Sequence, residues 1–195
     1  IDGALRTKLA TLAAKLELAR LTVNGELVAQ THPPVIRWNG AAVTPPPGSF
    51  LQATPEAEAE LQRLVVAQVG QAKRVADLFS GCGTFTFALA RSSAVSAFDS
   101  EADAIAALTT AARNAQGLKP ITAERRDLYR RPLGEAELNV FDAVVIDPPR
   151  SGAKAQCELI ARSTVRRVVA VSCNPATFAR DARTLIDGGY ALRGI

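Results

Sequence analysis

The sequence is poor in metal-binding residues and in long apolar runs. Its 195 residues include three cysteines and one histidine, and the cysteines lack the paired spacing that zinc and iron–sulfur sites need. No apolar stretch is long enough to span a bilayer, and no secretory signal pattern is present. We therefore expect no metal site and no membrane contact in this chain, and free thiols in a reducing, cytoplasmic environment.

The rest of the composition is typical of a globular protein. Hydrophobic residues make up 48% of the chain and charged residues 22%. The length of 195 residues suffices for one domain with an extension. The net charge of +4 permits RNA as a partner but does not require it, because lysine and arginine are spread along the chain. The first residue is Ile1 rather than Met, so we expect the chain to be part of a longer protein.

Two patterns divide the chain near residue 53. Before it, an Ala- and Leu-rich stretch at 4–15 predicts a helix, and Asn-Gly pairs at 24–25 and 39–40 predict two β-hairpins. After it, helix and strand signals alternate. We predict a small N-terminal antiparallel β extension over residues 1–53. Residues 54–195 are predicted to form an α/β domain, with a doubly wound, Rossmann-like sheet.

The alternating part predicts five complete strands and the start of a sixth. The predicted strands are 74–79, 94–98, 120–123, 141–146, 167–171 and 190–192. The predicted helices are 55–70, 85–90, 100–117, 155–162 and 175–186. Ser100, with Asp103 three residues later, has the spacing of a capping box and predicts the start of its helix there.

The segment DLFSGCGTFTF, residues 77–87, is a glycine loop between the first strand of the sheet and its helix. Gly81 and Gly83 let the backbone turn tightly and approach a ligand closely. A dinucleotide fingerprint would need a third glycine where Thr86 stands. The loop is therefore better suited to a nucleoside without phosphates than to a nicotinamide dinucleotide.

Acidic residues follow the next three strands. Asp99 could accept both ribose hydroxyls of a nucleoside or merely cap the next helix, and a cap at Ser100 favours the ribose interpretation. Asp127 is expected near the adenine edge. In the segment IDPPR, Asp147 could bind a base or an amino group and Arg150 a phosphate, unless the segment is only an Asp-Pro turn.

The segment VSCNPATFARD, residues 171–181, places Cys173 between an apolar strand and a helix opened by Asn174 and Pro175. Open α/β sheets bind their ligands at this edge, and the positive end of a helix favours the reactive thiolate. The alternative is an inert, buried cysteine, which is what we expect of Cys157 in its helix.

Taken in order, the segments FLQAT, DLFSGCGTFTF, FDSE, DPPRSG, VSCNPATFARD and GGY resemble the bacterial RNA uridine-5-methyltransferases that use S-adenosylmethionine, especially the ribosomal RNA branch. The resemblance covers about residues 50–192, and its most specific part is DPPR-x-G together with SCNPAT-x-ARD. It implies that Cys173 is the nucleophile and forms a covalent bond to C6 of a flipped or single-stranded uridine.

The resemblance also completes the set of candidate binding residues. Those for the cofactor are Gln52, Phe79, Gly81, Gly83, Thr84, Asp99, Asp127 and Asp147. Those for the substrate are Gln52, Asp147 and Arg150.

Several family features differ from this sequence or are missing from it. Thr84 and Thr54 stand where the family usually has asparagine. The family's general-base glutamate, its N-terminal RNA-binding module and the iron–sulfur cysteines of some members are not in this sequence. We therefore expect a monomeric catalytic core, cut at both ends, that does not complete turnover alone.

Other functions remain open at this point. A cytosine-5 methyltransferase would share the thiolate chemistry but usually has Pro or Thr beside the cysteine. Enzymes that methylate amino groups typically have an aromatic residue after Asp-Pro-Pro, where this chain has Arg150, and they require no catalytic cysteine. A catalytically silent RNA-binding module is the alternative outside enzymes. A nicotinamide oxidoreductase is disfavoured by the missing third glycine.

Overall fold

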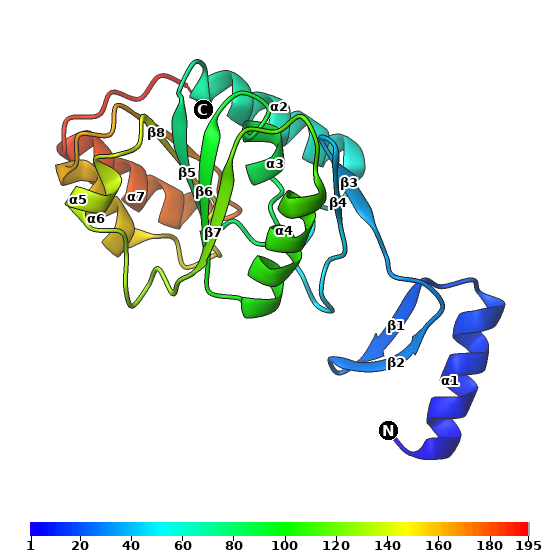
Figure 1. The fold of residues 1–195 in the computed structure, drawn as a ribbon. Coiled ribbons are helices and arrows are strands. Elements are labelled where there is room, and N and C mark those ends of the chain that lie inside the picture. Colours follow the sequence, from blue (N-terminus) through cyan, green and yellow to red (C-terminus); the bar gives the residue numbers. More distant parts are fainter. Residues whose placement is uncertain (195) are drawn as a thin grey trace.

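The computed structural model describes residues 1–194, and its ribbon is drawn in Figure 1. The helices are α1 (Gly3–Lys15), α2 (Pro55–Val69), α3 (Thr86–Leu89), α4 (Ala102–Asn114), α5 (Glu135–Leu138), α6 (Lys154–Arg162) and α7 (Pro175–Asp187). The strands are β1 (Arg20–Val23), β2 (Glu26–Gln30), β3 (Ile36–Trp38), β4 (Ala41–Val43), β5 (Arg74–Leu78), β6 (Ala94–Asp99), β7 (Ile121–Arg125), β8 (Ala143–Ile146) and β9 (Arg167–Ala170).

The centre of the fold is a five-stranded sheet in the order β7-β6-β5-β8-β9. All four strand pairs are parallel. The order of the strands reverses between β5 and β8, and in open α/β sheets ligands bind at the carboxyl ends of the strands at this point. The prediction of an α/β fold with a doubly wound parallel sheet is confirmed.

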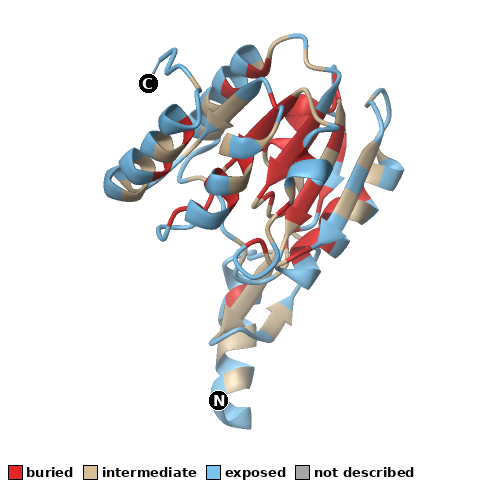
Figure 2. Ribbon diagram, turned by 90° about the vertical axis from the view of Figure 1, so that its left-hand side faces the viewer, coloured by how far each residue is buried: buried red, intermediate tan, exposed pale blue. Residues whose placement is uncertain are grey.

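Helices cover both faces of the sheet (Figure 1). On one face α5, α6 and α7 bury Leu138, Ile160 and Leu185 against β5 and β8. On the other face α2 contributes Val65 and Val69 to a second cluster with β5, β6 and β8. All four residues of β8 are buried, and the buried colour of the central strands is visible in Figure 2. This explains why these strands are continuous apolar runs rather than alternating ones.

The two N-terminal hairpins lie in different places. The β1–β2 hairpin lies with α1 to one side of the sheet (Figure 1), whereas Trp38 and Val43 of the β3–β4 hairpin are buried in a cluster with α4 residues. Trp38 stacks on Phe87 with ring centroids 6.4 Å apart, and its indole N–H donates to Glu58. The chain division at residue 53 remains a prediction.

Two local predictions are wrong. Residues 190–192 are not a strand. Tyr190 donates its N–H to the Leu185 carbonyl and its hydroxyl to the Val165 carbonyl, which fastens it beside α7 instead of in a sheet. Ser100 is not the helix cap either, because α4 begins at Ala102 after an N-cap residue, Glu101, that makes no side-chain capping bond.

We expect Trp38→Ala to lower the free energy of unfolding by about 3–5 kcal/mol, because it leaves a cavity beside Phe87. Trp38 is 3% exposed, whereas the neighbouring Val35 is 50% exposed. Val35→Ala is the matched control and should change stability by no more than about 0.5 kcal/mol. Urea unfolding measures both; equal losses would mean that the hairpin is not anchored through Trp38.

Candidate active site

The ends of the parallel strands bring the sequence-predicted residues to one edge of the sheet. Asp99 ends β6, and Asp147 directly follows β8. The hydrogen-bond ladder continues past the strand ends, since the N–H of Asp147 donates to the Leu78 carbonyl at 3.2 Å and that of Val171 to the Ile146 carbonyl at 2.9 Å. The segments that carry Phe79, Asp147 and Cys173 therefore leave adjacent strands at about the same level.

The two glycines of the loop after β5 have different local constraints. A Cβ on Gly83 would lie 2.7 Å from the Phe87 ring, so this position is restricted by packing beneath the loop. A Cβ on Gly81 would meet nothing within 4 Å, so Gly81 faces open space. Phe79 also has a positive φ, 62°, an uncommon conformation for a residue with a side chain. Its ring contacts Tyr129 with a centroid distance of 5.5 Å.

Asp99 ties the glycine loop to the start of α4. Its Oδ2 accepts the N–H of Gly81 at 2.8 Å, and its Oδ1 accepts the N–H of Glu101 at 2.9 Å. The bond to Glu101 forms a turn just before α4, and no side chain, including that of Ser100, caps the helix. The argument for ribose binding that relied on a cap at Ser100 is therefore wrong. Contact of Asp99 with ribose remains a prediction from the resemblance.

Asp127 has a similar local role after β7. Its Oδ1 accepts the N–H groups of Tyr129 at 3.0 Å and Arg130 at 3.2 Å, which forms a turn. Tyr129 donates its hydroxyl to the carbonyl of Gly152 at 3.0 Å. The segment after β7 is therefore in contact with the segment after β8.

A buried carboxylate within β5, that of Asp77, was not among the predicted site residues. It is 0% exposed, and its Oδ2 accepts a hydrogen bond from Thr86. Within residues 1–194, Asp77 Oδ1 and the hydroxyl of Ser80 have no hydrogen-bond partner. A carboxylate inside the apolar segment VADLF was the signal that could have identified it, because buried charges are usually paired.

Burial alters the acidity of the two carboxyl groups at the switch point. It raises the pKa of Asp77 to about 7, and the nearby charges of Asp147 and Asp99 act in the same direction. Burial also raises the pKa of Asp147 to about 6. Neighbouring carboxyl groups with raised pKa values are typical of functional sites.

Cys173 lies where the sequence predicts, between β9 and α7. Its residue is exposed, and the next residue, Asn174, caps α7 by accepting the N–H of Ala176 at 3.1 Å. Cys82 and Cys157 are buried, and burial raises the pKa of both thiols, that of Cys157 to about 12. Of the three cysteines, Cys173 is thus the accessible one, and the packing role predicted for Cys157 agrees with its burial.

The loop before α2 flanks the glycine loop and carries the half-buried Gln52. The thiol of Cys82 contacts the hydroxyl of Ser49 at 3.6 Å, and the Thr84 carbonyl accepts the amide of Gln62, in α2, at 2.9 Å. Phe50, for which we predicted no role, is 78% exposed in this loop. Gln52 therefore belongs to a loop that is held against the glycine loop.

Arg150 is exposed, and its backbone is fixed by the helix that follows Cys173. Its carbonyl accepts the Asn174 amide at 2.9 Å and the Thr177 hydroxyl at 3.1 Å. The two most specific motifs of the sequence, DPPR-x-G and SCNPAT-x-ARD, are therefore in direct contact.

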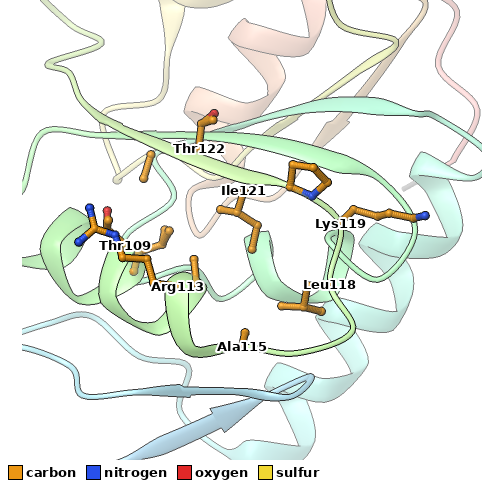
Figure 3. Close-up of a pocket in the computed structure, with 11 residues that line it drawn as sticks. Thr109, Arg113, Ala115, Leu118, Lys119, Ile121 and Thr122 are labelled. Carbon is orange, nitrogen blue, oxygen red and sulfur yellow. The ribbon is translucent and has the colours of Figure 1, made fainter.

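A groove of about 490 Å³ between the end of α4 and the start of β7 lies elsewhere (Figure 3). Its lining residues include Arg113, Lys119 and Ile121 and none of the candidate residues. The candidate residues follow the carboxyl ends of the strands, so this groove is not the candidate site. Among residues 1–194 no group of three metal-ligating side chains is found, and no helix there is long and apolar enough to cross a membrane.

We expect iodoacetamide at pH 8 to label Cys173 much faster than Cys82 or Cys157. Only Cys173 is exposed, and thiols with raised pKa values carry little of the reactive thiolate. Mass mapping of the three cysteine peptides over time measures this order. In denaturant the three rates should converge; equal rates in the folded protein would contradict the burial of Cys82 and Cys157.

We expect the free energy of unfolding of ligand-free Asp77→Asn, relative to that of wild type, to increase as the pH rises from 4 to 7. The folded-state pKa of Asp77 is raised to about 7, so the folded state binds more protons than the unfolded state. The wild type therefore loses stability as pH rises from about 4 to 7 and loses no more above it.

Urea unfolding across this pH range measures the difference between Asp77→Asn and wild type. Asp147→Asn should show the same sign, with the difference levelling near pH 6, since the pKa of Asp147 is raised to about 6. A pH-independent difference for Asp77→Asn would show that this carboxyl group titrates normally.

Comparison with known proteins reveals relatives along most of the chain. A protein of Rhizobium meliloti described as an uncharacterized RNA methyltransferase is 53% identical over 178 residues, covering 91% of this chain and 43% of that protein. The 23S rRNA (uracil(1939)-C(5))-methyltransferase RlmD of Chromohalobacter salexigens is 39% identical over 150 residues, covering 75% of this chain and 31% of that protein. The chain thus spans less than half the length of these relatives.

A solved structure has the same fold. The Pyrococcus abyssi tRNA (uracil-54, C5)-methyltransferase in complex with S-adenosyl-L-homocysteine superposes with a TM-score of 0.64 at 29% identity, covering 82% of this chain and 40% of that chain. The tRNA (uracil-5-)-methyltransferase family matches residues 36–189, in agreement with the resemblance found in the motifs. The chain belongs to this family of RNA methyltransferases.

Proposed function

We propose that this chain is the catalytic core of an RNA methyltransferase that transfers a methyl group to C5 of a uridine through a covalent bond to Cys173. The observation that carries the proposal is an exposed thiol between β9 and the start of α7. Because β9 pairs with β8, which precedes Asp147, the thiol lies at the edge where parallel sheets bind ligands. The family and the named relatives support uracil C5 as the target.

Cys173 would activate the uracil ring, because C5 alone is a poor nucleophile. Its thiolate adds to C6, an S–C6 bond forms, and the electrons of the C5–C6 double bond move toward C5 and O4. When bound, S-adenosylmethionine supplies an electrophilic methyl group, which C5 acquires in exchange for its proton. A base removes that proton, the C5–C6 double bond re-forms, and the S–C6 bond breaks to release Cys173.

Asp147 and Gln52 would hold the polar edge of the uracil. With a pKa raised to about 6, Asp147 is mainly ionised at pH 7 and able to accept the N3–H of uracil. Arg150 is exposed on the same loop and would contact an RNA phosphate. Because C6 is shielded in a stacked helix, the target uridine would be flipped out or single-stranded.

The site fits S-adenosylmethionine in its chemistry. The buried Asp77 Oδ1 and Ser80 hydroxyl lack partners among the described residues, which suits a ligand that brings an ammonium group and hydroxyl groups. Gly81 faces open space beside Asp99, as a close backbone approach to a nucleoside requires. The proposed cofactor residues are Gln52, Phe79, Gly81, Gly83, Thr84, Asp99, Asp127 and Asp147, with Asp99 on the ribose and Phe79 and Asp127 near the adenine.

Ribosomal RNA is the proposed substrate class. The relative named for 23S rRNA is 39% identical to this chain, compared with 29% for the archaeal tRNA enzyme. We also propose that the protein acts as a monomer in the cytoplasm, where its three free cysteines would remain reduced.

Trapping on RNA that contains 5-fluorouridine tests this function. We expect the full-length protein, with S-adenosylmethionine, to form a covalent protein–RNA band that carries one added methyl group. Fluorine at C5 cannot leave as a proton, so the adduct accumulates with or without a general base. Denaturing gels and intact mass measure it, with Cys173→Ala as the variant that should lose the band and Cys157→Ala as the matched control that should keep it.

The RNA supplied separates the remaining functions. Trapping on 23S rRNA fragments but not on tRNA supports the ribosomal substrate, and the reverse result supports tRNA. A band formed only with 5-fluorocytidine RNA would identify a cytosine-5 methyltransferase. Binding of RNA and S-adenosylmethionine without any band would leave a catalytically silent binding module or an amino-group methyltransferase.

A further inference from the structure

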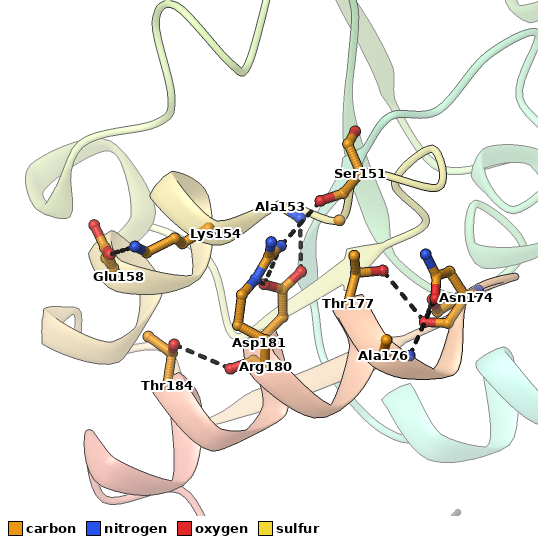
Figure 4. A network of polar contacts seen from close by, with 12 residues as sticks. Ser151, Ala153, Lys154, Glu158, Asn174, Ala176, Thr177, Arg180, Asp181 and Thr184 are labelled. Carbon is orange, nitrogen blue, oxygen red and sulfur yellow. Dashed lines mark hydrogen bonds and ion pairs between the residues drawn. The ribbon is translucent and has the colours of Figure 1, made fainter.

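The loop of residues 147–153, which follows β8, is bound along its length to α7 (Figure 4). Besides the bonds from Asn174 and Thr177 to the Arg150 carbonyl, the guanidinium of Arg180 donates to the Ser151 carbonyl at 3.0 Å. These bonds come from the first and second turns of the helix whose N-terminus carries Cys173. The loop with Asp147 and the start of α7 are thus one connected unit.

Asp181 is the most buried polar member of this contact. It is 7% exposed. Its Oδ2 accepts the N–H of Ala153 at 2.6 Å, and its Oδ1 accepts Nε of Arg180 at 2.8 Å. A buried carboxylate is costly unless it is paired and hydrogen-bonded, and here each oxygen has a donor. The Asp181 carboxylate therefore links the end of the loop, at Ala153, to Arg180, and Arg180 also donates to the Ser151 carbonyl.

Gly152 is adapted to the same contact from the side of the loop. Its φ is 74°, and a Cβ there would lie 2.5 Å from Asp181 Oδ2 and 2.4 Å from the guanidinium of Arg180. A side chain at this position would meet both groups. On its other side the Gly152 carbonyl accepts the hydroxyl of Tyr129. The loop is therefore held from two directions, and its backbone conformation is restricted to glycine where α7 touches it.

We propose that Asp181 is a positioning residue that fixes the 147–153 loop, with Asp147 and Arg150, relative to Cys173. This inference rests on the proposed function. Cys173 follows β9, whereas Asp147 and Arg150 follow β8, so their separation depends on how the 147–153 loop contacts α7. A displacement of about 1 Å between reacting groups can cost about 10²-fold in rate, and the contact made by Asp181 is the buried, charged part of this connection.

Asp181→Asn in the full-length protein tests the proposal. An amide offers one acceptor oxygen to the two donors, Ala153 N–H and Arg180 Nε, so the loop should loosen while α7 remains folded. We expect the single-turnover rate of adduct formation on 5-fluorouridine RNA to fall by about 10²-fold. The dissociation constant for S-adenosylmethionine should stay within about twofold of wild type, since Asp181 is outside the proposed cofactor site.

Asp187→Asn is the matched control. It makes the same chemical change at the end of the same helix, in an exposed ion pair with Arg183 at 3.4 Å, and should leave the rate of adduct formation unchanged. Gly152→Ala perturbs the contact from the loop side and should reproduce the rate loss of Asp181→Asn. Thr177→Val removes one hydrogen bond to the Arg150 carbonyl and should give a smaller loss with little risk to folding.

Cysteine labelling separates positioning from loss of structure. In a positioning variant, iodoacetamide should label Cys173 at the wild-type rate and leave the buried Cys82 and Cys157 slow. Adduct formation by Asp181→Asn at the wild-type rate would overturn the proposal. The proposal would also be overturned if every variant that forms the adduct slowly also showed faster labelling of Cys157, because the rate loss would then come from a loosened structure. It would stand if Thr177→Val and Gly152→Ala formed the adduct slowly while Cys157 remained protected. Absence of an adduct in the wild type would instead refute the proposed function.

Discussion

The parallel pairing of β5 with β8 is the interaction on which the rest of this structure depends. It runs from Val75 opposite Ala143 to Leu78 opposite Ile146, at the point where the strand order reverses. The helices that follow the two strands must leave on opposite faces, which opens a space above the strand ends. The glycine loop and the Asp147 loop therefore enter the same space although about 70 residues separate them in the chain.

The same arrangement places unfavourable charge where the ligand is expected. Asp77 is buried within β5, with one oxygen unpartnered in the described part of the chain, and burial raises its pKa to about 7. Asp147 at the end of the neighbouring strand also has a pKa raised to about 6 by burial. A raised pKa in the folded state means that the ionised carboxylate lowers the stability of the free protein. Carboxyl groups that reduce stability in the free protein are explained if a cationic or hydrogen-bonding ligand completes them, because such a ligand restores the interactions that burial removes.

Much of this architecture was predictable from the sequence because the central strands β5 and β8 are buried on both faces. Continuous apolar runs followed by Asp99, Asp147 or Cys173 identify strand ends, and parallel connections bring these ends to one edge. The local errors arose where side chains made hydrogen bonds that the sequence pattern does not reveal. Asp99 binds the N–H groups of Gly81 and Glu101, and α4 begins beyond Ser100 without a side-chain cap. Tyr190 donates to carbonyl groups beside α7 instead of entering a strand.

What the sequence could not reveal is how its two strongest motifs depend on each other. As strings of residues, DPPR-x-G and SCNPAT-x-ARD are separate segments, each compatible with a simple turn or helix start. In the fold, the glycine of the first motif is required by the arginine and aspartate of the second, because a Cβ at Gly152 would overlap with both side chains. The spacing from Cys173 to Asp181 places the cysteine before α7 and the carboxylate two turns into it, facing the loop. The contacts between the two motifs therefore join the segment of Cys173 to the 147–153 loop, and neither motif alone makes this connection.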